Sequence, residues 1–351
     1  MSTISALPAP SEPWKIKDPT FTLQQLVTHL GTPVLAALLT VISPVSGKSG
    51  FFVVWLPLHI LTAALLGKFG HRKKDFANTT LEVLMGAAMV VFATFVASVL
   101  WPVISQGVAA FNFNLLTEDA SATEVDAALT VGGMSHAIVG SLVIVGLATL
   151  ISVPIGILAA LYVTEVRGKL TPFVRFFVQA MSGVPSIVAG LFVYAALVVS
   201  GIMSFSGLAG AIALAILMLP TVARTAEEIL RLVPDDLRTA ALALGGTQWR
   251  VVRMVVLPAA RSGLITAAIL GIARVAGETA PLLLTAFGNT ALNLNPVTDS
   301  MSALPLYVFT QMLLGGENDV ARAWFACLVL LVIVTLLFTT ARIAASKMKK
   351  A

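Results

Sequence analysis

Two residues of opposite charge lie inside one of the most apolar stretches of this chain. Arg274 and Glu278 occur in the segment IARVAGETAPLLLTA, within an apolar run over about residues 262–286. An arginine at the centre of a membrane helix costs about 2.5–3.5 kcal/mol on insertion scales, so such a residue usually faces a cavity or a partner. Its planar guanidinium can hold an oxyanion through two hydrogen bonds. Glu278, one helical turn away, would limit how tightly that anion is retained. The pair therefore predicts a pathway for an anion.

The same spacing also allows a structural interpretation. Residues four positions apart meet on one helix face, so Arg274 and Glu278 can simply neutralise each other. Replacing both with leucine would remove the cost altogether, which favours a functional role. Gly271, Gly277 and Pro281 surround the pair and permit a close backbone approach or a kink.

A second arginine lies at the end of another apolar run. Arg224 follows the run at about residues 207–223. An arginine at the membrane surface commonly extends its charge to water in this way, so the position fits an ordinary surface role as well as a functional one. Glu228 lies four residues further on, and this spacing predicts an ion pair with Arg224. We retain Arg224, with Arg274 and Glu278, as a candidate residue of the anion pathway.

The longest polar interruption between apolar runs covers about residues 224–261. Proline and aspartate suit the first turn of a helix and glycine suits its end. Pro234-Asp235-Asp236 and Gly245-Gly246 therefore predict a short helix over residues 235–246. A second amphipathic segment follows, which Leu257-Pro258 is expected to end.

The short helix has a small apolar face. Leu237, Ala241 and Leu244 fall at i, i+4 and i+7. Such a face fits a groove on a partner protein. A helix lying along the bilayer surface has the same pattern, so the residues alone leave both interpretations open.

Composition places these elements in a membrane. Of the 351 residues, 58% are hydrophobic and 11% are charged. That charged fraction is less than half of the roughly 25% that is typical of soluble domains. The apolar runs are long enough to cross a bilayer. The sequence predicts an all-α integral membrane protein with spans at about residues 23–43, 51–67, 80–103, 136–162, 173–199, 207–223, 262–286 and 322–341.

The basic residues define an orientation, because lysine and arginine are retained on the cytoplasmic side. With both termini in the cytoplasm, nineteen of the 22 lysines and arginines lie in cytoplasmic segments. We therefore expect segments 104–135 and 287–321 to face outward, and a helix near Leu306–Leu314 in the second. The proline- and serine-rich residues 1–20 predict a disordered cytoplasmic tail, and residues 346–351 form a basic one.

The sequence lacks the motifs of several chemistries. It contains no GxxxxGK[ST] phosphate loop, so the chain is not expected to bind and split ATP itself. No metal site or other cofactor is expected, because the single Cys327 lies in an apolar run and the histidines are isolated. The basic residues are scattered, which argues against a nucleic-acid partner. Energy for uphill transport must then come from a partner protein or an ion gradient.

The polar interruption resembles a known loop signature. Thr239-Ala240-Ala241, then Gly245, then Val255-Val256-Leu257-Pro258 is similar to the EAA–G–I–LP loop of ABC importer permeases. In that family the loop forms a coupling helix that sits in a cleft of the cytoplasmic ATPase. Thr239 departs from the glutamate that the family most often has. The resemblance implies ATPase contacts by Asp236, Leu237, Thr239, Ala240, Ala241, Leu244 and Gly245.

Residues of about 130–345 resemble the PstA family of phosphate importer permeases. The resemblance rests on GIARVAGETAPLLLTA, TVARTAEEILRLVP, AALALGGTQWRVVRMVVLPAA, HAIVGSLVIVGLATLISVPIGILAALYVTE and GVPSIVAGLFVY. It implies a six-span permease core over about residues 79–345 and associates Arg224, Arg274 and Glu278 with phosphate passage. The implied partners are a sister permease (PstC-like), two copies of an ATP-binding subunit (PstB-like) and an extracytoplasmic phosphate-binding protein (PstS-like).

The expected function is therefore a permease subunit of an ATP-driven phosphate importer, surrounded by lipid in the bacterial plasma membrane. Another oxyanion such as molybdate or sulfate is the nearest alternative. An ion-coupled secondary carrier is the alternative of a different class, although a coupling loop has no purpose in a self-contained carrier. The resemblance supplies no role for the additional pair of spans expected within residues 21–78.

Overall fold

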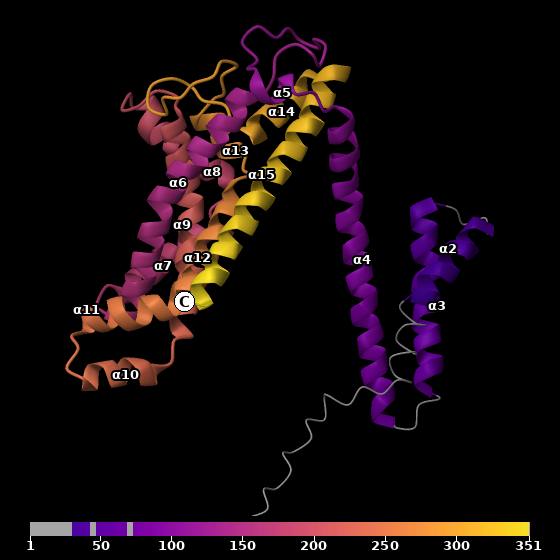
Figure 1. Ribbon diagram of the computed structural model, residues 1–351, viewed down its shortest axis with the longest axis horizontal. Coiled ribbons are helices and arrows are strands. Elements are labelled where there is room, and N and C mark those ends of the chain that lie inside the picture. Colours follow the sequence, from indigo (N-terminus) through magenta and orange to yellow (C-terminus); the bar gives the residue numbers. More distant parts are fainter. Residues whose placement is uncertain (1–29, 43–46, 69–72, 351) are drawn as a thin grey trace, which may run out of the picture. The chain divides into compact units, whose positions relative to one another are not determined.

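The computed structural model describes residues 30–42, 47–68 and 73–350, and these ranges consist of helices joined by turns and loops (Figure 1). The chain divides into two compact units, Met1–Trp101 and Pro102–Ala351. The boundary falls inside helix α4 (Lys73–Ala109).

The first unit contains α2 (Thr32–Ile42) and α3 (Gly47–Lys68). At 1.5 Å per residue, an eleven-residue helix is about 16 Å long, roughly half of the hydrocarbon thickness of a bilayer. α2 alone therefore does not form the span expected at residues 23–43, of which residues 23–29 lie outside the described part. The apolar part of α3 is Gly50–Thr62, and among the described residues neither helix is long and apolar enough to cross a membrane.

Five helical segments in the described chain are long and apolar enough to span a membrane. They are Ala88–Ala109, Ser135–Val166, Gly207–Arg231, Gln248–Val275 and Glu317–Thr340. The first belongs to α4, and the second consists of α6 (Ser135–Leu161) and the π-helical η3 (Tyr162–Val166). The third is α9, and the last belongs to α15 (Glu317–Lys350).

A sixth candidate span is broken. α7 (Thr171–Ser182) is followed by α8 (Ser186–Val193) and η4 (Tyr194–Val199), and the two parts are bent by 107°. The span expected at residues 173–199 therefore consists of two helical parts with a sharp bend between them. Pro185 has no N–H to donate and disfavours helical backbone at the residue before it, which explains the break.

The segment Gln248–Val275 differs from the expected pattern at both ends. It runs without interruption through α11 (Gln248–Val251), η5 (Val252–Val256) and α12 (Leu257–Val275), so Leu257-Pro258 does not end the amphipathic segment. The wider π turn of η5 shifts the carbonyl of Met254, with which the Pro258 ring would clash in a regular helix. The helix then stops at Val275, well before the expected end of the span at residue 286.

α9 is the central helix of the second unit. Of its most apolar window, 67% is buried inside the chain, whereas the figure for Ser135–Val166 is 22%. α6 and α12 approach it closely at glycines. A Cβ added at Gly271 of α12 would lie 2.7 Å from Val222 Cγ2 and 2.9 Å from Met218 Cε, so only glycine permits this crossing.

Short helices and loops complete the unit on the side away from α10. They include α5 (Asn114–Thr117), α13 (Ala280–Thr285) and α14 (Leu304–Leu314), and α14 confirms the helix expected near Leu306–Leu314. Asp119 joins the loop after α5 to the loop after α13, because its Oδ2 accepts from the Leu292 N–H at 3.1 Å.

Arg322 of α15 is buried beneath the loop after α5, with 1% of the residue exposed. Its Nη2 donates to the carbonyl oxygens of Ala127, Ala128 and Val131 at 3.0, 2.8 and 2.9 Å. One guanidinium therefore satisfies three backbone acceptors of the loop and holds it against the helix.

Candidate functional site

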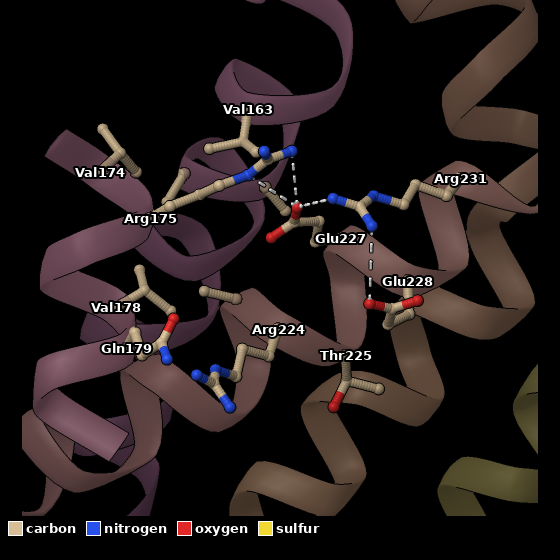
Figure 2. Close-up of a pocket in the computed structure, with 13 residues that line it drawn as sticks. Val163, Val174, Arg175, Val178, Gln179, Arg224, Thr225, Glu227, Glu228 and Arg231 are labelled. Atoms are coloured by element: carbon tan, nitrogen blue, oxygen red, sulfur yellow. Dashed lines mark hydrogen bonds and ion pairs between the residues drawn. The ribbon is translucent and has the colours of Figure 1, made fainter. Parts of the chain in front are cut away.

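A cavity of about 560 Å³ lies at the C-terminal end of α9, between that helix, α7 and the end of α6. We call it the α9 cavity. Its polar lining consists of Arg175, Gln179, Arg224, Thr225, Glu227, Glu228 and Arg231, and Figure 2 shows these side chains. Three guanidinium groups and two carboxylates thus line one space that opens beside a candidate membrane span.

Glu227 of α9 connects two of these arginines. Its Oε1 accepts from Arg175 of α7 at 3.1 Å and from Arg231 at 2.5 Å, and the three groups form a chain that joins α7 to α9 (Figure 2). Glu227 is the least exposed of the three, with 16% of its side chain accessible. The Glu227 carboxylate therefore accepts hydrogen bonds from the Arg175 and Arg231 guanidinium groups that an oxyanion could otherwise accept.

Arg224 has no carboxylate partner in the described part of the chain. The expected ion pair between Arg224 and Glu228 is absent. Glu228 lies 4.0 Å from Arg231 instead, and with 74% of its side chain exposed it is mostly hydrated. Figure 2 shows the Arg224 side chain extending toward Gln179 of α7. An exposed, uncompensated guanidinium at a cavity wall is suited to bind an anion transiently.

Arg274 lies beside the same helix. It is exposed in the last turn of α12, and its Nη1 donates to Thr221 Oγ1 of α9 at 2.8 Å. Thr221 and Arg224 are three residues apart and therefore share a side of α9. The structure thus brings Arg274 and Arg224 to one side of the central helix, a relationship that the sequence does not indicate.

Glu278 does not lie on a helix with Arg274. α12 ends at Val275, and Glu278 follows in the turn before α13, where its backbone N–H donates to the Val275 carbonyl at 3.2 Å. No ion pair joins Arg274 to Glu278 within the described residues. Gly277 and Pro281 favour this break, because glycine is a weak helix former and Pro281 fits the first turn of the new helix.

The predicted short helix is present as α10 (Asp235–Ala243). Pro234 precedes it, and Gly245 ends it with φ +79°, a left-handed conformation that favours glycine. Its expected apolar face is divided. Leu237 is 46% and Leu244 90% exposed, whereas Ala241 packs against the buried cluster that contains Val251 and Val252. Asp236, Thr239 and Ala240 are exposed, and the Thr239 hydroxyl donates to the Asp235 carbonyl at 3.1 Å.

Two exposed apolar residues outside this face were missed by the sequence analysis. Leu242 is 51% and Trp249 67% exposed. Leu242 does not fall on the helical spacing of Leu237, Ala241 and Leu244, and Trp249 belongs to the amphipathic segment that follows the short helix. Leu237 and Leu244 share one side of α10, whereas Leu242 lies on the opposite side and Trp249 belongs to α11.

α10 is fixed to the bundle by one arginine. Arg238 Nη2 and Nε donate to Glu165 of η3 at 2.8 and 3.1 Å, and Nη2 also reaches the Leu230 carbonyl at 2.8 Å. The hydrogen bond to Glu165 is the main reason that the pKa of Arg238 is raised above its usual value. Gln248 Nε2 donates to the Glu165 carbonyl at 2.5 Å. The bond between Arg238 and Glu165 spans two segments that are distant in the sequence, and spacing alone gives no signal for it.

Comparison with known proteins places these features in a family. The family model for "Binding-protein-dependent transport system inner membrane component" matches residues 152–350, which include α9, α10 and α12. This defines the chain as a membrane permease component of a transport system with a separate binding protein.

Curated relatives narrow the family. The Phosphate transport system permease protein PstA of Haemophilus influenzae is 41% identical over 246 residues, which cover 69% of this chain and 84% of that protein. The PstA of Yersinia pestis is 37% identical over 274 residues, covering 78% of this chain and 91% of that protein. The chain belongs to the PstA family of phosphate transport system permease proteins.

Among solved structures, the chain is similar to the MetNI methionine ABC transporter in an inward-facing conformation. The similarity has a TM-score of 0.48 at 24% identity and covers 62% of this chain and 94% of that chain.

Proposed function

We propose that this chain is the membrane permease subunit of an ATP-driven importer, and that inorganic phosphate passes along the side of α9 that carries Thr221 and Arg224. The observation that carries the proposal is Arg224, which lines a cavity of about 560 Å³ without a carboxylate partner among the described residues. Phosphate has a charge of about −1.5 near neutral pH, and its oxygens match the donor fork of arginine. Relatives named for phosphate transport favour this anion over molybdate or sulfate.

The arginines along α9 are arranged to let phosphate pass through and not to hold it tightly. Arg274, held by Thr221, meets the anion first, and Arg224 lies one helical turn further along α9. Beyond it, Arg175 and Arg231 are already bonded to Glu227. An anion that reaches them must compete with that carboxylate, which limits its affinity and permits release.

Energy for the transport comes from a separate ATPase. We propose that α10 docks on an ATP-binding subunit through Leu237 and Leu244, because exposed apolar side chains on a loop between spans need a partner. The concentration of basic residues at the α10 end supports a cytoplasmic position for it and for both termini. A sister permease, a second ATP-binding subunit and an extracytoplasmic phosphate-binding protein would complete the complex.

The residues before the permease core have a separate role in this proposal. Residues 21–78 form an additional N-terminal pair of membrane segments at the periphery, preceded by a cytoplasmic tail at residues 1–20. Deletion of residues 1–67 should then lower the amount of assembled complex more than the transport rate of each complex. Loss of transport in fully assembled complexes would instead place these segments in the pathway.

Phosphate uptake by vesicles that contain the assembled complex tests the function directly. Arg224→Gln keeps a polar side chain of similar length but removes the charge, and we expect it to lower uptake at least about tenfold. Arg342→Gln removes a charge from the exposed end of α15 and serves as the matched control. Uptake of Arg224→Gln at the wild-type rate, normalised to assembled complex, would contradict the proposal.

A further inference from the structure

A second cavity, of about 500 Å³, lies on the α10 side of the bundle. We call it the α10 cavity. Four segments meet around it: the residues after η3, the start of α7, the end of α9, and α10. Each contributes one guanidinium, and the polar lining is Arg167, Arg175, Arg231, Arg238, Thr164, Thr171 and Asp235.

Most of the positive charge around this cavity is already compensated. Arg238 is paired with Glu165 at 2.8 Å and with Asp235 at 3.0 Å. Arg175 and Arg231 share Glu227, and Arg231 lies 4.0 Å from Glu228. The potential in the cavity is therefore not uniformly positive. Whether a ligand binds there depends on the polar groups that have no partner within the protein.

Two polar groups of the lining have no ionic or hydrogen-bond partner for their terminal donors among the described residues, and they come from adjoining segments. Arg167 has no carboxylate partner in the described chain, and its Nε donates to the Thr164 carbonyl at 2.8 Å. Its terminal nitrogens have no partner there. The Thr171 hydroxyl is buried without any hydrogen-bond partner. Buried polar groups in native proteins are normally satisfied. Thr171 lines the cationic cavity, so a rotation of its hydroxyl toward the cavity would let it donate to a bound ligand.

The backbone conformation at Arg167 fixes this arrangement. Arg167 has φ 50°, a left-handed conformation that is uncommon for residues other than glycine. Its N–H donates to the Tyr162 carbonyl at 3.0 Å, which ends η3. This left-handed cap, a common way for a helix to end, sets the position of Arg167 beside the cavity.

We propose that the α10 cavity binds a phosphate group, held by the terminal nitrogens of Arg167 and by the Thr171 hydroxyl, with Arg175 and Arg231 behind it. Two sources have this chemistry: free inorganic phosphate and the headgroup of an anionic phospholipid. The site is separate from the α9 cavity, although Arg175 and Arg231 line both. It does not depend on whether phosphate is the transported anion.

A phosphate group bound in the α10 cavity would change how α10 is attached to the bundle. Arg238 lines the cavity and also attaches α10 to Glu165 of η3. A bound phosphate group competes with Glu165 and Asp235 for that guanidinium and so alters the attachment of α10. The ATPase rate of the complex should therefore depend on the ligand.

Binding of radiolabelled inorganic phosphate to the nucleotide-free complex of permease and ATP-binding subunits, purified without the phosphate-binding protein, tests the proposal. In discs of phosphatidylcholine, we expect Arg167→Gln to lower the affinity at least about tenfold and Thr171→Val to lower it less. Lys169→Gln removes an exposed charge from the same loop and should leave binding unchanged. Arg224→Gln should lower uptake at least about tenfold yet retain this binding, which distinguishes the failure of this proposal from the failure of the pathway assigned above.

A second arm identifies the source. In discs of phosphatidylcholine and phosphatidylglycerol, the phospholipid retained by each purified complex is measured by mass spectrometry. Retention that falls in both Arg167→Gln and Thr171→Val would identify the headgroup as the ligand. An effect of these variants on inorganic phosphate alone would identify the free anion. If neither variant, in properly assembled complexes, changes either signal, the proposal is wrong.

Discussion

Arg274 and Thr221 join α12 to α9 through a hydrogen bond of 2.8 Å, one helical turn before Arg224. The bond links two residues that are distant in the sequence and holds the guanidinium along the central helix. It also provides Arg274 with the polar contact that helical spacing predicts from Glu278.

The first prediction follows from this contact. Thr221→Val keeps the shape of the side chain but removes the acceptor, and we expect phosphate uptake to fall about tenfold because Arg274 loses its orientation. Arg274→Gln should abolish uptake, and Arg274→Lys should restore only part of it, because an ammonium lacks the fork of donors. Near-normal uptake by the double variant Arg274→Leu, Glu278→Leu would show that the arginine is structural.

The crossing of α12 over α9 gives a second prediction. Gly271→Ala places a methyl group within 2.7 Å of Val222, whereas Gly146→Ala on α6 meets no atom within 4 Å. Both changes give the same gain in helix propensity, so the difference in stability between the two variants reports the cost of packing at Gly271. We expect Gly271→Ala to be less stable than Gly146→Ala by about 1–3 kcal/mol in thermal unfolding of the purified complex. Equal stability would mean that α12 can move away from α9 without cost.

Docking of the ATPase gives a third prediction. Leu244→Asp puts a charge on a side chain that is 90% exposed, so the fold of the permease should remain intact while the ATPase no longer co-purifies. Leu232→Asp changes an equally exposed leucine, 81%, just before α10 and is the control. Ala241 is a poorer site for this test, because it packs against the bundle. Retention of the ATPase by Leu244→Asp would exclude this end of α10 from the interface.

The buried arginine of α15 gives a fourth prediction. Arg322→Met removes the donor to three carbonyl groups of the loop after α5. We expect the complex to lose about 3 kcal/mol of stability, since buried acceptors without a partner cost about 1–3 kcal/mol each. Proteolysis of this loop should accelerate, and Arg322→Lys should restore only part of the protection. An unchanged rate of proteolysis would show that other contacts hold the loop.

The contact between Asp119 and Leu292 gives a prediction about pH. The pKa of the Asp119 carboxyl is lowered by hydrogen bonds from the Ser121 side chain and from the backbone of Leu292 and Ser121. A carboxyl whose pKa is lowered on folding stabilises the contact above its unfolded value of 3.8, and this contribution is lost as the pH falls through the folded value. The hydrogen-exchange protection of the Leu292 amide should therefore persist down to that range in wild type. It should be low at every pH in Asp119→Ala.

The sequence predicts where the helices of this protein lie, but it does not predict where they are interrupted. Hydrophobic runs locate α6, α9 and α15, and the turn residues locate α10. The same runs predicted spans over 173–199 and 262–286 but located neither break, because periodicity counts apolar residues and does not register a bend. The breaks after Ser182 and Val275 depend on how proline and glycine are accommodated in three dimensions.

The candidate site was only partly predictable for a related reason. Arg224 and Arg274 are visible as charges beside apolar runs. Their common position along α9, the bond from Arg274 to Thr221 and the bond from Arg238 to Glu165 depend on packing between segments that are distant in the chain. Spacing along one helix suggested Glu228 as the partner of Arg224 and Glu278 as the partner of Arg274. Neither of these two ion pairs is present among the described residues, and Glu228 lies 4.0 Å from Arg231 instead.

The uninterrupted helix Gln248–Val275 has a mechanical consequence. Its 28 residues make a rod of about 42 Å, with Trp249 near one tip and Arg274 near the other. α12 lies closely against α9 at both Gly263 and Gly271, so the rod has two points of support and cannot pivot about one. A sideways push at Trp249 would then carry α12 and α9 together, and Arg274 would move with Thr221 as one rigid body.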